Sequence, residues 1–193
     1  SRPGSRAKIG VSSRSPSAIP RAPLLRCRSR RAAGRRPGQA GPGRPIRVLL
    51  VASAGGHWTE LQRLRSAFVG TDCQFVSTSK GMAAPVGHRE ILQIPESARD
   101  SIRAVAPTLT ALVRIVRRFD PDLVVSTGAA PGALALAVGK LFGARTIWID
   151  SIANSETLSL SARLVRPVAD LRITQWPHLA RRNPSSRYLG AVL

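Results

Sequence analysis

The sequence predicts an α/β fold, a Rossmann-like doubly wound parallel sheet. Two observations carry this prediction. Short apolar runs rich in β-branched residues, typical of strands buried on both faces, alternate with stretches that repeat apolar residues at helical spacing. Small-residue turns containing glycine directly follow two of these runs. Strands that alternate with helices form a parallel sheet, because each helix returns the chain to the same edge.

The first strand and helix are expected at 46–68. The apolar run 46–52 predicts a strand, and the turn after it contains Ser53, Gly55, Gly56 and His57. The next helix should bury four residues at roughly helical spacing, Trp58, Leu61, Leu64 and Phe68, with Glu60, Arg63 and Arg65 between them. A glycine turn before a helix exposes backbone N–H groups, so the sequence predicts an anion site here, although tight glycine turns also serve any α/β fold.

The other elements follow in order. Further strands are expected at 72–78, 90–95, 123–126, 145–150 and 170–174, and further helices at 100–118, 133–142 and 159–166. A loop is expected at 79–89, and residues 188–193 end the chain. Pro107 interrupts the helical pattern at 100–118, which predicts either a kinked helix or two segments.

A second small-residue turn follows the strand at 123–126. It contains Thr127, Gly128, Ala129, Ala130, Pro131 and Gly132, and Pro131 suits the first turn of the next helix. The strand at 145–150 ends in the carboxylate of Asp150. Because ligands of such sheets bind at the carboxyl ends of the strands, the two glycine turns and the loop after Asp150 should share one edge and one site.

Two glycine turns that feed two helices suit a diphosphate, since backbone amides bind its oxygens. His57 could deprotonate a hydroxyl group. Asp150 could orient His57, act as the base itself, or cap the following loop. The dinucleotide and Walker motifs are absent, so we expect neither NAD nor ATP and no other cofactor. Neither the spacing of His57, His88 and His178 nor that of Cys27 and Cys73 suggests a metal site.

Residues 1–45 differ in composition from 46–193. They carry +12 of the net charge of +20, contain no acidic residue, and are rich in arginine, proline, glycine and serine. We therefore expect a disordered tail and one folded domain at 46–193. The tail could bind nucleic acid or anionic lipid, target the chain, or be translated sequence upstream of a later start. Plain disorder or the last alternative is favoured and nucleic-acid binding is not expected, because no aromatic residues are interleaved with the arginines.

Outside the tail, one predicted helix is a candidate for contact with a membrane. The chain has no apolar run of about 18 residues, so no transmembrane helix is expected. The helix at 100–118 carries Arg103, Arg114, Arg117 and Arg118 beside an apolar stripe. Such a helix can lie on an anionic membrane, but its stripe more often packs on the sheet. We favour the packed interpretation, and a neighbouring stripe could still contact lipid.

Four motifs in order resemble the Alg-fourteen family over 46–193. They are Val51–His57, Ser126–Gly132, Ile147–Ser151 and Ala169–Pro177, the last ending in Gln-Trp-Pro. Members are membrane-associated, acceptor-side subunits of two-protein UDP-sugar glycosyltransferases, and bacterial relatives serve exopolysaccharide and capsule assembly. The resemblance implies the N-terminal, acceptor half of a GT-B glycosyltransferase. It also implies a separate donor-binding partner of Alg-thirteen type and a saccharide acceptor on a polyprenyl diphosphate.

The resemblance also implies roles for residues. Gly55, Gly56, His57 and the stretch 128–132 would face the acceptor, with Ser53 and Thr127 beside them, and His57 would be the base or would position the acceptor hydroxyl. Asp150 stands where many relatives have glutamate, so its catalytic role stays open. We expect an inverting, metal-free transfer at the cytoplasmic face of the cell membrane, with peripheral attachment and activity only in the complex. The alternative is a non-catalytic membrane scaffold for the partner.

Overall fold

A computed structural model describes residues 44–79, 89–95 and 102–191. For residues 102–104, at the start of the long helix, it describes the backbone only. Within these residues the strands form one sheet in the order β3-β2-β1-β4-β5-β6-β7, and every pairing is parallel. The doubly wound sheet is thus confirmed, with the strand order of a Rossmann fold. Residues 1–43 of the predicted tail, with Cys27, and residues 80–88 of the predicted loop, with His88, lie outside the described residues.

The elements agree with the sequence prediction except at a few boundaries. The strands are β1 (Arg47–Ala52), β2 (Asp72–Ser77), β3 (Leu92–Gln93), β4 (Leu123–Ser126), β5 (Arg145–Ile149), β6 (Leu171–Thr174) and β7 (Arg187–Tyr188). The helices are α1 (Gly56–Arg63), α2 (Ile102–Phe119), α3 (Ala129–Leu141), α4 (Leu160–Leu164) and α5 (Pro177–Arg182), with a 3-10 helix, η1, at Leu64–Phe68. The sequence did not predict α5 or β7, which are both short, and it predicted the residues of η1 as the last part of the first helix.

Two helices differ from their expected form for identifiable reasons. α2 is a single helix that contains Pro107, so the alternative of two segments is wrong. α3 begins at Ala129 instead of residue 133. Its first turn contains Pro131, and proline is tolerated there because the first N–H groups of a helix have no partner within the helix. Residues 129–132 of the small-residue turn therefore belong to the first turn of α3.

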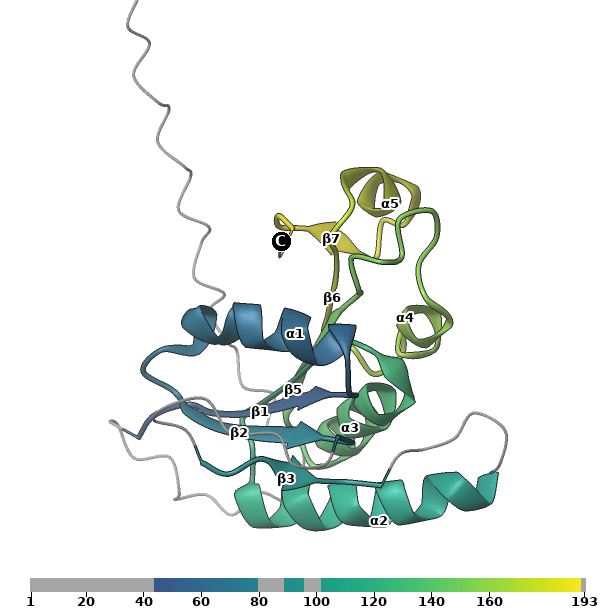
Figure 1. Cartoon of the computed structure of the whole chain (residues 1–193). Coiled ribbons are helices and arrows are strands. Elements are labelled where there is room, and N and C mark those ends of the chain that lie inside the picture. Colours follow the sequence, from purple (N-terminus) through teal and green to yellow (C-terminus); the bar gives the residue numbers. More distant parts are fainter. Residues whose placement is uncertain (1–43, 80–88, 96–101, 192–193) are drawn as a thin grey trace, which may run out of the picture. The chain divides into compact units, whose positions relative to one another are not determined.

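The sheet is covered on both faces (Figure 1). Along β1, Val48, Leu50 and Ala52 point to the face covered by α1 and η1, and Leu49 and Val51 point to the face covered by α2 and α3. Both sets are buried, as expected for a central parallel strand.

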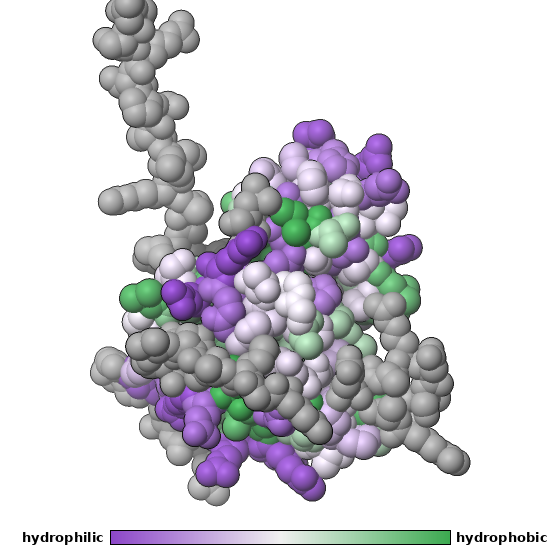
Figure 2. All heavy atoms as spheres, in the orientation of Figure 1, coloured by the Kyte–Doolittle hydropathy of each residue, from purple (hydrophilic) through white to green (hydrophobic). Residues whose placement is uncertain are grey.

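The long helix α2 packs its apolar stripe on the sheet, as the sequence favoured. Leu112, Val116 and Phe119 are buried, while Arg114, Arg117 and Arg118 are exposed. Figure 2 shows hydrophilic side chains gathered at the lower left of the view, where α2 ends. Among the helices of the described segments, none has the length and hydropathy that a membrane crossing requires.

The register brings the two glycine turns together. Val51 near the end of β1 lies beside Ser126 at the end of β4, and Ser126 lies beside Trp148 of β5. The turns after β1 and β4 and the loop after β5 therefore follow neighbouring strands at one edge, as predicted. At the opposite edge, Arg44, which the sequence assigned to the tail, donates two hydrogen bonds of 2.9 and 3.1 Å to Asp122.

Candidate active site

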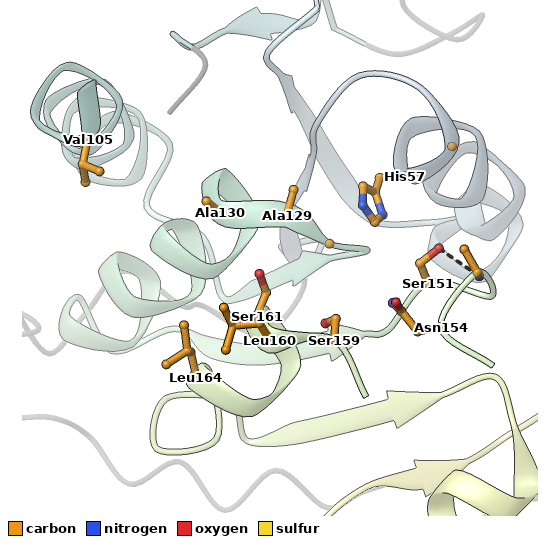
Figure 3. Close-up of a pocket in the computed structure, with 13 residues that line it drawn as sticks. His57, Val105, Ala129, Ala130, Ser151, Asn154, Ser159, Leu160, Ser161 and Leu164 are labelled. Carbon is orange, nitrogen blue, oxygen red and sulfur yellow. Dashed lines mark hydrogen bonds between the residues drawn. The ribbon is translucent and has the colours of Figure 1, made fainter. Parts of the chain in front are cut away.

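A cavity of about 520 Å³ opens at the carboxyl edge of the sheet (Figure 3). Its polar end contains His57, Ser151 and Asn154, and its apolar end contains side chains from α2 and α4. The residues that line it come from both glycine turns, α2, the loop after β5 and α4: Gly56, His57, Val105, Gly128, Ala129, Ala130, Ser151, Ala153, Asn154, Ser159, Leu160, Ser161 and Leu164.

His57 joins the two glycine turns. Its ring lies against Gly128, where an added Cβ would be 2.3 Å from Cε1 and 2.4 Å from Nδ1. Its backbone carbonyl accepts a 2.7 Å hydrogen bond from Thr127 Oγ1. Gly128 also has φ +152°, and Ala129 after it has φ +62°, a left-handed conformation that costs a non-glycine residue about 1–2 kcal/mol. The contact with His57 therefore requires glycine and a strained turn.

Two of the three described helices that begin at the cavity, α1 and α3, have uncapped N-termini. Among the described residues, no side chain caps α1 or α3, and neither helix has an acidic residue in its first turn. α4 differs, because the Ser159 hydroxyl accepts a 2.9 Å hydrogen bond from the Ala162 amide. The first amides of α1 and α3 and the positive ends of their dipoles therefore face a cavity without side-chain anions.

Asp150 organises the loop after β5. Its carboxylate is 2% exposed and accepts hydrogen bonds from Ser159 Oγ (2.6 Å), Ser159 N (3.0 Å), Asn154 Nδ2 (3.3 Å) and Trp148 Nε1 (3.4 Å). No hydrogen bond joins it to His57 among the described residues, and it does not line the cavity. These contacts support the capping alternative over an orienting or basic role, because the carboxylate is already occupied.

Glu60 is a buried carboxylate that the sequence pattern left among the polar positions of α1. It is 5% exposed, and its Oε1 accepts hydrogen bonds from Ser151 Oγ (2.8 Å) and Ile152 N (2.9 Å). Its second oxygen, Oε2, is buried and has no partner among the described residues, and His57 Nδ1 is in the same state. Its spacing of three residues from His57, which predicts a shared helix face, was the signal that could have identified it.

The Gln-Trp-Pro motif holds the same loop from the side of β6. Gln175 Nε2 donates a 3.1 Å hydrogen bond to the Asp150 carbonyl, and Trp176 Nε1 donates one of 2.8 Å to the Ile152 carbonyl. The loop that carries Ser151 and Asn154 into the cavity is thus tied to α1 by Glu60 and to the end of β6 by this motif.

The structure brings only part of the predicted set into the cavity wall. Gly56, His57, Gly128, Ala129 and Ala130 line it. Pro131 and Gly132 are buried in α3, Thr127 is buried with its hydroxyl on the His57 carbonyl, and Ser53 and Gly55 lie outside the lining. The rest of the polar lining consists of residues that the sequence did not single out: Ser151, Asn154, Ser159 and Ser161. Serine and asparagine after a strand give no distinct signal.

Comparison with known proteins identifies the family. The model of the family described as "Oligosaccharide biosynthesis protein Alg14 like" matches residues 88–192. The chain belongs to the Alg14-like family. The matched stretch contains the second glycine turn, the loop after β5 and the Gln-Trp-Pro motif.

Curated relatives of this Alg14-like chain carry one name, UDP-N-acetylglucosamine transferase subunit ALG14. That of Eremothecium gossypii is 29% identical over 83% of this chain and 85% of its own length. The human protein is 27% identical over 79% of this chain and 85% of its own length. The Schizosaccharomyces pombe protein is 30% identical over 75% of this chain and 82% of its own length.

Solved structures share the fold of the Alg14-like chain. MurG of Acinetobacter baumannii, a GT-B glycosyltransferase, superposes with a TM-score of 0.59 at 17% identity over 76% of this chain. UDP-N-acetylglucosamine 2-epimerase of Rickettsia bellii superposes with a TM-score of 0.59 at 13% identity over 77% of this chain. This chain spans less than half of their lengths, 46% and 45%. These similarities support the predicted relation to a GT-B fold.

Proposed function

We propose that this chain is the acceptor-binding and membrane-recruiting subunit of a two-protein UDP-sugar glycosyltransferase in oligosaccharide or polysaccharide biosynthesis. Its family and the name of its curated relatives support this role and favour UDP-N-acetylglucosamine as the donor. The observation that carries the acceptor half of the proposal is that two uncapped helix N-termini and His57 meet in one cavity.

The cavity suits a diphosphate attached to a lipid. The free amides at the start of α1 and α3 can donate to phosphate oxygens, and the helix dipoles favour the negative charge without a basic side chain. At the apolar end, Leu160 and Leu164 are 67% and 66% exposed and lie with Val105 on the lining. The diphosphate would bind between the glycine turns, and the first isoprene units would contact this apolar end.

His57 would act on the acceptor sugar. As general base it takes the proton of the acceptor hydroxyl while that oxygen bonds to the anomeric carbon of the donor sugar and UDP leaves with the electron pair of the broken bond. Attack from the face opposite UDP inverts the anomeric centre. In this scheme a partner subunit of Alg-thirteen type brings the UDP-sugar to the open cavity.

Membrane recruitment would use the domain surface. The exposed arginines of α2 can attract anionic headgroups at the cytoplasmic face of the cell membrane. We assign the transferase role to residues 46–193 and none to the tail. Deleting residues 1–43, which spares the Arg44–Asp122 pair, should leave transfer unchanged.

The deciding experiment is a transfer assay with purified components: UDP-N-acetylglucosamine, a polyprenyl-diphosphate-linked sugar, this chain and the donor-binding subunit. We expect product only when both proteins are present. Full turnover by this chain alone would contradict the two-subunit proposal.

A His57→Ala variant separates catalysis from scaffolding. Loss of a general base should lower turnover by about 10²–10⁴-fold with partner binding intact. The matched control is His178→Ala, because His178 on α5 does not line the cavity. Unchanged turnover in His57→Ala would instead support the alternative of a non-catalytic membrane scaffold for the partner.

A further inference from the structure

Two buried polar atoms of α1 lack hydrogen-bond partners within the described residues: His57 Nδ1 and Glu60 Oε2. Buried polar groups are nearly always hydrogen-bonded, so each such atom needs an explanation. His57 and Glu60 are three residues apart on one helix, a spacing that makes side chains neighbours. A single hydrogen bond from Nδ1–H to Oε2 would satisfy both atoms.

We propose that Glu60 is the positioning residue of the site, and that its Oε2 accepts the Nδ1 hydrogen of His57 and leaves Nε2 free to act in the cavity. Glu60 is suited to this role because its other oxygen is held in place by Ser151 Oγ and Ile152 N. A carboxylate that is anchored through one oxygen can present the other in a fixed direction. The same residue thereby ties the loop after β5 to the helix that carries His57.

The other charged groups around the site do not compete for this role. Among the described residues that line the cavity, His57 is the one titratable side chain. Asp150, at the end of β5, is the other buried carboxylate near the loop, and its oxygens are occupied by Ser159, Asn154 and Trp148. Arg172 of β6 donates to the Ala162 carbonyl and to Ser185.

The test is the tautomer of His57, read from the ¹⁵N shifts of the neutral imidazole in the full-length chain. The chain has three histidines, and a His57→Ala spectrum assigns the signals. In the unmodified protein we expect Nδ1 to carry the hydrogen and Nε2 to be bare. A bare Nδ1 in the unmodified protein would overturn the proposal without any variant.

Glu60→Gln separates positioning from tethering. The two donors that hold Oε1 require an oxygen, so the glutamine oxygen takes that place and the amide NH₂ replaces Oε2. The NH₂ group then donates to Nδ1, and the ring hydrogen should move to Nε2. The variant thus keeps the loop tether and reverses the tautomer, whereas a structural residue alone would leave the tautomer as it was.

The control variant is Glu90→Gln, the same chemical change at an exposed carboxylate ahead of β3. It should leave the His57 shifts unchanged. An unchanged tautomer in a folded Glu60→Gln protein, or the same change in Glu90→Gln, would overturn the proposal.

The consequence for transfer rests on the proposed function. We expect Glu60→Gln to lower kcat by about 10²–10⁴-fold with little change in the KM for the acceptor, because a ring with its hydrogen on Nε2 cannot take a proton there. A reversed tautomer with unchanged kcat would overturn the positioning role. The tautomer is measured without the partner or the substrates, so failure of the transferase proposal would be recognised separately.

Discussion

The imidazole ring of His57 lies directly against Gly128, on the neighbouring turn of the sheet edge. A Cβ at position 128 would lie 2.3 Å from Cε1 of the ring, closer than a Cβ atom approaches any non-bonded heavy atom. The two turns are 70 residues apart in the chain, and this contact with the Thr127 hydrogen bond sets their relative position. The cavity exists in its present form because position 128 has no side chain.

Gly128→Ala should therefore displace the His57 ring. We expect a loss of about 1–3 kcal/mol in the free energy of unfolding from overpacking, and a fall in turnover of about 10²-fold from the misplaced ring. Urea denaturation and the two-subunit transfer assay measure the two effects. Gly70→Ala is the control, because Gly70 also has positive φ (+82°) but open space around it. Equal turnover losses in both variants would contradict a specific role for the His57–Gly128 contact.

Gly132 and Ser126 should be energetically coupled. A Cβ at position 132 would lie 1.9 Å from Ser126 Oγ, so Gly132→Ala should destabilise the protein by about 1–3 kcal/mol. In a Ser126→Ala background this oxygen is gone and the remaining Cβ distance is 3.0 Å, so the same substitution should cost less. A double-mutant cycle from urea denaturation measures the coupling. If the costs of the two substitutions simply add, α3 moves away from β4 to make room for the new Cβ, and the clash with Ser126 Oγ does not determine the cost.

The main effect of Asp150→Asn should be a loss of protein stability and not a direct loss of catalysis. The carboxylate accepts hydrogen bonds from Ser159, Asn154 and Trp148 while 2% exposed, and an amide cannot accept them all. We expect the free energy of unfolding, measured by thermal denaturation, to fall by about 2–3 kcal/mol, the usual cost of losing hydrogen bonds to a buried charge. A variant with unchanged stability and no turnover would instead support the catalytic alternative.

Asp170 should make the fold sensitive to acid. Burial raises the pKa of its carboxyl group, but the hydrogen bond from Lys140, those from Thr146 and the Lys140 charge outweigh burial and bring the pKa below its ordinary value. A group with a depressed folded-state pKa stabilises the protein above its unfolded pKa, about 3.9, and the stabilisation disappears as the pH falls through the folded value.

Removing this carboxylate should change the pH profile. We expect Asp170→Asn to reduce stability at pH values near neutral and to weaken the loss of stability below about pH 4. Guanidinium unfolding over a series of pH values provides the comparison. Parallel profiles for the variant and the unmodified chain would show that other carboxylates determine acid unfolding.

The arginines of α2 should control membrane binding if the proposed recruitment is correct. Replacing the exposed Arg114, Arg117 and Arg118 by glutamine should weaken binding to anionic vesicles by about 1 kcal/mol for each residue, and added salt should weaken it in the unmodified chain. Vesicle co-sedimentation measures this. The control replaces Arg181 and Arg182, which are exposed on another helix, α5. An equal loss for each replaced arginine in both variants would show that net charge alone matters.

The sequence alone determined the parallel sheet, the two glycine turns and their shared edge. These features depend on local patterns: apolar runs, glycine and helical spacing, each readable within about ten residues. The resemblance of four motifs identified the family, which the comparisons confirmed. It could not assign roles within the site, and the catalytic roles of His57 and Asp150 stay predictions.

Only the tertiary structure decided which polar groups are occupied. Asp150 and Glu60 both lie next to apolar residues and look equivalent in the sequence. Folding gives both oxygens of Asp150 hydrogen-bond donors, whereas Glu60 receives donors on Oε1 alone and Oε2 stays unpaired among the described residues. The reason is physical: hydrogen-bond partners such as Ser159 or Ser151 come from other elements, and their distances are set by packing across the sheet edge, not by spacing along the chain.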